Sequence, residues 1–124
     1  MRLLLGTHVV LWQLSGEQTL SEGAREAIGE ATDLLVSSVF YAEVGIKASV
    51  GKVVVPTDLR ERIAAAGVRT LALSPAHGLA IADLPVHHRD PFDRLLIAQA
   101  RVEGLTVVTA DACFRDYPVD LVEA

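Results

Sequence analysis

The chain has 124 residues, 51% of them hydrophobic, and its 16 acidic and 11 basic side chains give a formal net charge of −5. This length indicates one domain, residues 1–124, with a substantial core, and the apolar runs are too short to span a bilayer. The negative charge argues against a simple electrostatic nucleic-acid binder, but not against a nuclease, since metal ions can bridge acidic sites and phosphates. The single cysteine, Cys113, excludes an intramolecular disulfide and fits a reducing cytoplasm.

Short apolar runs alternate with helical segments along the chain. We expect strands at residues 3–5, 34–36, 70–73, 106–109 and near 120–122. We expect helices at 9–14 with Thr7 as a cap, at 21–31, 39–50 and 58–66, from 75 to before Pro85, from 90 to Gly104, and a helical turn at 112–114. This alternation predicts an α/β fold, a three-layer α/β/α sandwich with a central parallel sheet.

Residues 87–98 form the most informative stretch, a loop that turns into an apolar helix. Asp90 is a good N-cap, Pro91 follows at the position where helices tolerate proline best, and Asp93 lies in the first turn. The helix dipole favours negative charge there. The sequence therefore predicts that this helix holds the Asp93 carboxylate at an edge of the fold.

Three acidic residues can gather at the rim where parallel sheets bind ligands, beyond the carboxyl ends of the strands. Asp93 begins the central helix, Asp111 follows the strand at 106–109, and Glu43 lies one turn into an apolar helix after the second strand. Clustered carboxylates repel one another unless cations or protons intervene. Hard cations such as Mg²⁺ or Mn²⁺ accept carboxylate oxygens and can activate water against a phosphodiester.

Each acidic residue also has a structural interpretation. Glu43 is spaced i,i+4 from Lys47, which is typical of a helix ion pair. Asp90 acts mainly as a cap, Asp93 could complete a capping arrangement with it, and Asp111 could be a turn residue.

The basic residues of this region are less informative. Arg89 and Arg94 flank the rim and could hold phosphates, although solvated surface charge is the commoner role. The adjacent His87 and His88 lack the i,i+4 spacing of a zinc pair, and no thiolate supports one.

Four segments carry a resemblance to a known family. They are residues 3–8 (LLLGTH) with Leu11-Trp12, 41–47 (YAEVGIK), 88–100 (HRDPFDRLLIAQA) and 107–111 (VVTAD). Taken together, and over essentially the whole chain, they resemble the PIN-domain ribonucleases, specifically the VapC-type toxins of bacterial type II toxin–antitoxin pairs.

The resemblance implies a Mg²⁺- or Mn²⁺-dependent endoribonuclease that acts on single-stranded or looped RNA. Its metal ligands would be Glu43, Asp93 and Asp111, with the Thr109 hydroxyl nearby. It further implies a cytoplasmic homodimer inhibited by a VapB-like antitoxin, whose tail occupies the acidic groove.

One position departs from the family pattern. The family has an aspartate at the end of the first strand, where this chain has Gly6. Glycine supplies no ligand, so we expect weakened metal binding and an inactive or impaired enzyme. The alternative is a non-catalytic PIN-like module that binds antitoxin or RNA without cleaving it. A phosphoacceptor receiver domain is disfavoured, because neither Leu73-Ser74 nor Val108-Thr109 is followed by the required Asp or Lys.

Overall fold

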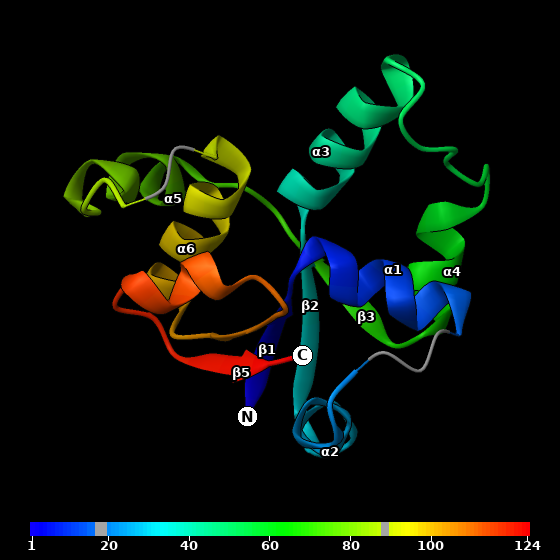
Figure 1. Ribbon diagram of the computed structural model, residues 1–124, viewed down its shortest axis with the longest axis horizontal. Helices are drawn as coiled ribbons and strands as arrows, with labels where there is room; N and C mark the ends of the chain where they lie inside the picture. Colours follow the sequence, from blue (N-terminus) through cyan, green and yellow to red (C-terminus); the bar gives the residue numbers. More distant parts are fainter. Residues whose placement is uncertain (17–19, 88–89) are drawn as a thin grey trace.

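A computed structural model describes residues 1–16, 20–87 and 90–124. Within these ranges, five strands form one parallel sheet in the order β3-β2-β1-β4-β5 (Figure 1). The strands are β1 (Arg2–Leu5), β2 (Asp33–Ser37), β3 (Val68–Leu71), β4 (Thr106–Thr109) and β5 (Leu121–Glu123). The first strand of the sequence thus occupies the centre of the sheet.

Helices cover both faces of this sheet. They are α1 (Thr7–Ser15), α2 (Glu22–Glu30), α3 (Ser38–Ser49), α4 (Leu59–Ala65), α5 (Pro75–Ala80) and α6 (Pro91–Glu103), with 3-10 turns η1 (Ile81–Asp83) and η2 (Ala112–Asp116). One core cluster joins the sheet to α1, α2 and α4, and the other joins it to α6 and η2. The predicted three-layer α/β/α sandwich is confirmed.

Strand β1 shows why the sheet must be covered on both faces. Leu3 and Leu5 pack in one core cluster and Leu4 in the other, and all three are at most 1% exposed. Side chains alternate between the faces of a strand, so an uninterrupted apolar run indicates burial on both sides.

Among the described residues, no helix is long and apolar enough to cross a membrane.

Most predicted helix starts are confirmed, but the start of α1 is not. The side chains of Ser21, Ser37, Ser74 and Asp90 accept hydrogen bonds from backbone N–H groups of the following turn. The expectation that Thr7 caps the first helix is wrong. Gly6 is the N-cap of α1 and provides no side-chain bond, while Thr7 is the first helical residue and its hydroxyl is bonded elsewhere.

Several element boundaries also differ from the expected ones. Strand β3 covers Val68–Leu71 instead of 70–73, because Gly67, at φ +80°, turns the chain directly from α4 into the strand. The helix expected from 75 to before Pro85 ends at Ala80 and continues as η1. Small shifts of this kind reflect how weakly local sequence defines the ends of elements.

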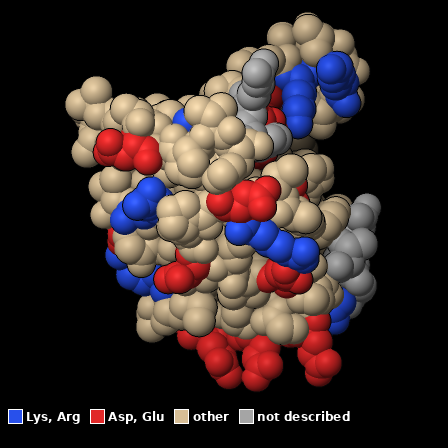
Figure 2. Space-filling model, turned by 60° about the vertical axis from the view of Figure 1, so that its left-hand side comes forward, with Lys and Arg blue, Asp and Glu red and all other residues tan. Residues whose placement is uncertain are grey.

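Acidic and basic side chains are interspersed over the face shown in Figure 2, and acidic side chains gather along its lower edge.

On the sheet, Arg69 of β3 pairs with Asp33 of β2, with 3.0 Å between Nε and Oδ1. This bonded guanidinium, with a smaller contribution from Arg2, holds the pKa of the Asp33 carboxyl below its ordinary value.

We expect the Asp33–Arg69 pair to make stability depend on pH in the acidic range. A carboxylate with a depressed folded-state pKa stabilises the fold above its unfolded pKa of about 3.8, and this contribution is lost as pH falls through the folded value. The stability difference between the parent and Arg69→Gln, measured by urea unfolding, should therefore be present at neutral pH and vanish at strongly acidic pH. Arg60→Gln controls for the loss of an exposed arginine. A difference that does not change with pH would contradict a role through Asp33.

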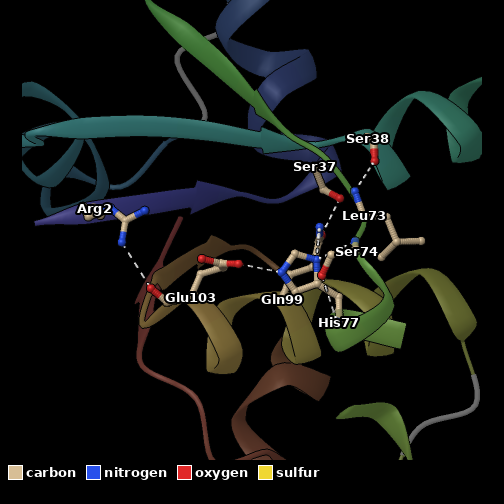
Figure 3. Close-up of polar contacts among 8 residues, drawn as sticks. All are labelled: Arg2, Ser37, Ser38, Leu73, Ser74, His77, Gln99 and Glu103. Carbon is tan, nitrogen blue, oxygen red and sulfur yellow. Dashed lines mark hydrogen bonds and ion pairs between the residues drawn. The ribbon is translucent and has the colours of Figure 1, made fainter. Parts of the chain in front are cut away.

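A buried polar network joins the end of β2 to α5 and α6 (Figure 3). The Ser37 hydroxyl donates to Oε1 of Gln99, and the Gln99 amide lies 3.4 Å from Nδ1 of His77. That nitrogen accepts the Ser74 N–H at 3.0 Å, so Nε2 of His77 carries the proton and donates to Glu103 at 2.8 Å. Ser37, His77 and Gln99 are at most 1% exposed. The network therefore satisfies polar groups that burial would otherwise leave unpaired.

Candidate functional site

A pocket of about 130 Å³ lies at the carboxyl ends of β1 and β4, beside the starts of α1 and α6. All three acidic residues predicted for the rim, Glu43, Asp93 and Asp111, line it, together with Gly6 and Thr109. The rule that ligand sites form beyond strand ends, together with the start of α6, therefore predicted the acidic residues that line this pocket.

Glu43 is the most buried of these acidic residues, and its side chain is only 11% exposed. Its Oε1 accepts the hydroxyl of Thr7 at 2.9 Å, and its Oε2 lies 2.7 Å from Nζ of Lys47. Burial of an ionised carboxylate is costly unless charge and hydrogen bonds compensate it. Glu43 thus both lines the pocket and forms the i,i+4 ion pair that its spacing allowed.

Asp90 and Asp93 come from the start of α6. Oδ1 of Asp90 accepts the N–H groups of Phe92 at 2.8 Å and of Asp93 at 3.3 Å, which confirms the expected cap. Asp90 also lines the pocket. By fixing the first turn of α6, this cap holds the backbone of Asp93 in place at the pocket wall.

Asp111 lies just after β4 and caps η2. Its Oδ1 accepts the N–H of Cys113 at 2.9 Å, and its own N–H donates to the Thr109 hydroxyl at 3.0 Å. A hydrogen bond from the Cys113 thiol to this carboxylate, with further acidic residues nearby, raises the pKa of the thiol. The thiol therefore stays protonated at neutral pH, which makes it a weak nucleophile.

Gly6 also lines the pocket, beside the end of β4. A Cβ atom at this position would lie 3.0 Å from the Val108 carbonyl oxygen and 3.6 Å from Oγ1 of Thr109. The backbone of Gly6 is extended, with φ −69° and ψ 164°, which any residue can adopt. A side chain here needs a shift of a few tenths of an ångström at the end of β4, but no change of backbone conformation.

The donor atoms of the pocket fit a hard divalent cation in kind, since they are carboxylate and hydroxyl oxygens. Their arrangement fits less well. No group of three or more His, Cys, Asp or Glu residues within the described ranges stands close enough together to hold a metal ion. Gly6 offers no oxygen from its side chain, and both oxygens of Glu43 already have partners.

Other residues considered from the sequence lie away from the pocket or outside the described ranges. The Arg94 guanidinium approaches the carbonyl of Ile81, with 3.4 Å between Nη2 and the oxygen, and does not line the pocket. His87 contacts Tyr117 edge-on at 5.3 Å between ring centres. His88 and Arg89 lie outside the described residues.

Thr7 lines the pocket and donates a hydrogen bond to Glu43, a contact that the sequence did not predict. The one available signal was its position directly after the first strand.

Comparison with known proteins places this geometry in a family. The family described as "PIN domain" matches residues 3–120. Ribonuclease VapC22 of Mycobacterium tuberculosis is 30% identical over 118 residues, which cover 93% of this chain and 91% of that protein.

Among solved structures, VapBC2 from Rickettsia felis, bound to a DNA fragment from its promoter, aligns with a TM-score of 0.73 and 18% identity over 99% of this chain and 98% of that one. DNA-bound VapBC from Salmonella typhimurium aligns with a TM-score of 0.69 and 15% identity over the same shares of each chain. At these identities, the two structures support the fold alone.

Proposed function

Because the chain belongs to the PIN-domain family, in its VapC group, we propose that it is a metal-dependent endoribonuclease toxin of a toxin–antitoxin pair, impaired by the loss of one metal-site carboxylate. The observation that carries the proposal is the pocket at the strand ends. Glu43, Asp93 and Asp111 line it, and Gly6 occupies the position from which a fourth carboxylate would reach it.

The chain's own residues would position the ligands in this proposal. Glu43, Asp93 and Asp111 do not form a ready metal cluster in the metal-free chain, so their side chains would have to move together to hold Mg²⁺ or Mn²⁺. The bound ion would supply an activated water and neutralise charge on a phosphodiester. Thr7 orients Glu43 through its 2.9 Å hydrogen bond. Thr109 fixes the backbone of Asp111 at 3.0 Å. With Gly6, the cation loses one anchoring oxygen, and misplacement by about 1 Å can lower a rate on the order of 10²-fold.

The same proposal assigns partners and a setting. RNA is the proposed substrate, supported by the 30% identity to a protein named ribonuclease VapC22, and a cation held by the carboxylates would bridge them to its phosphates. A VapB-like antitoxin is the proposed protein partner, supported by the VapBC complexes among the structural neighbours. We further propose that residues 1–124 act as one domain in a cytoplasmic homodimer.

Titration with Mn²⁺ tests the metal site itself. We expect the melting temperature of the parent chain to rise by about one to two degrees when the Mn²⁺ concentration equals its Kd, because a ligand that binds only the folded state stabilises it by mass action, there by about 0.4 kcal/mol. Asp93→Asn and Asp111→Asn should abolish the rise. Asp116→Asn, which removes a carboxylate of η2 that does not line the pocket, should leave the rise intact.

A non-catalytic PIN-like module that binds antitoxin or RNA is the alternative function. Gly6 favours it, and so does the absence of a gathered metal cluster among the described residues. Such a module need show no response to Mn²⁺ and would bind RNA equally in EDTA. A flat melting temperature in both the parent and Asp93→Asn would therefore favour this alternative over the nuclease.

A further inference from the structure

Lys47 supplies the one Lys or Arg side chain among the described residues that line the carboxylate pocket. Its Nζ lies 2.7 Å from Oε2 of Glu43, and its side chain is 45% exposed. The ammonium group thus approaches from the solvent side a carboxylate that is itself largely buried. A cation of the chain already neutralises the most buried acidic residue of the pocket.

The contacts of Glu43 leave little capacity for another cation. Its Oε1 is bonded to Thr7 and its Oε2 to Lys47. A metal ion that binds Oε2 competes with the ammonium group, since two cations at one oxygen repel each other. An aspartate at position 6 would add negative charge to attract the metal ion, but Gly6 adds none.

An ordinary surface pair with the same spacing provides a comparison. Arg62 and Asp58 also stand at i,i+4, but their side chains are 52% and 53% exposed, and neither residue lines the pocket. Water screens such a pair. Spacing alone does not distinguish the two pairs, whereas the burial of Glu43 and its place in the pocket wall do.

We propose that Lys47 is a built-in counter-ion of the pocket that competes with the divalent cation for Glu43. This inference rests on the proposed function, because it requires the pocket to be a metal site. Lys47 then keeps the buried carboxylate compensated in the metal-free chain and lowers the affinity of the chain for the metal.

Electron paramagnetic resonance of free Mn²⁺ tests the competition without any assay of cleavage. We expect Lys47→Met to bind Mn²⁺ roughly five-fold more tightly than the parent. In this variant the metal ion no longer has to break a partly exposed ion pair, and such pairs are worth about this much. Lys47→Arg, which keeps the positive charge, should bind like the parent, and so should Arg62→Met. In a Glu43→Gln background, Lys47→Met should no longer tighten binding.

The outcomes separate the two proposals, with Gly6→Asp as the reference for a restored site. Mn²⁺ binding by Gly6→Asp, with no tightening in Lys47→Met, would overturn the role of Lys47 alone. No binding by any variant would overturn the metal site and the competition together. If Lys47→Met does not fold, NMR of the unaltered chain decides: Mg²⁺ must shift the ε-methylene signal of Lys47 more than that of Lys52, and equal shifts would overturn the inference.

Discussion

Gly6→Asp should cleave a structured RNA pool in the presence of Mg²⁺ or Mn²⁺ at least about 100-fold faster than the parent chain, because a restored ligand corrects the position of the activated water. EDTA should abolish the gain. The backbone at position 6 already has an extended conformation compatible with aspartate, so the substitution restores a ligand without strain at φ. The measurement is the initial rate of fluorescent RNA cleavage in each metal.

The structure identifies the risk in this substitution and its controls. The new Cβ begins 3.0 Å from the Val108 carbonyl oxygen, so the end of β4 must yield slightly. In Gly6→Ala, the new Cβ makes the same close contact with the Val108 carbonyl oxygen but adds no ligand. The melting temperature of this variant therefore reports the cost of the contact. Gly6→Asn keeps nearly the shape of aspartate, including the ability to cap α1, but lacks the charge. Cleavage by Gly6→Asp alone would assign the gain to the carboxylate.

Cleavage by Gly6→Asn at the rate of Gly6→Asp would contradict this account, because an uncharged side chain would then suffice. Cleavage by neither variant would favour the non-catalytic module, provided that the pool contains the RNA that the chain recognises. Combining Gly6→Asp with Asp93→Asn should return the rate to that of the parent.

Gln99→Leu should lower the free energy of unfolding by about 2 kcal/mol, because it leaves buried polar groups without partners. Gln99 is fully buried and accepts the Ser37 hydroxyl, and its amide lies beside His77 (Figure 3). Leucine is of similar size but can satisfy neither group. Urea unfolding followed by circular dichroism measures the loss, with Gln13→Leu, an exposed position on α1, expected to change stability by less than about 0.5 kcal/mol.

A double-mutant cycle tests whether the loss comes from the hydrogen bond. Ser37→Ala removes the donor, and also a cap of α3 that bonds the Val39 N–H at 3.0 Å. The double variant should therefore lose less than the sum of the two single losses. Strict additivity would show that Gln99 stabilises the fold by packing instead.

The layered fold was predictable from the sequence because the apolar runs carry its main physical constraint. Leu3-Leu4-Leu5 is apolar without interruption, and only a strand covered on both faces can bury all three side chains. The capping residues Ser21 and Asp90 defined helix starts by local chemistry that needs no tertiary contact. Strand β3 was misplaced because it begins directly after the turn at Gly67 and includes the charged Arg69. The side chain of Arg69 is bonded to Asp33 of β2, which is distant in sequence.

The sequence predicted which acidic residues line the pocket, but not the contacts that they make there. Strand ends and the first turn of α6 placed Asp93 and Asp111 at a common rim, and both line the pocket. The bond between Thr7 and Glu43 joins residues of α1 and α3, so it follows from tertiary packing rather than from any local pattern. The pair of Glu43 with Lys47 was visible from spacing, but its place in the pocket wall was not.

The position of β1 has a consequence for synthesis on the ribosome. This strand is made long before β4, yet β4 is one of its two neighbours, with Thr106 aligned to Leu3. Pairings between such distant parts of a chain close large loops and form slowly. Asp111, which follows β4, also lines the pocket. Nascent chains that end before β4 therefore contain the first pocket residues but lack this carboxylate. The acidic residues of the pocket are therefore complete only after the segment that follows β4 has been made.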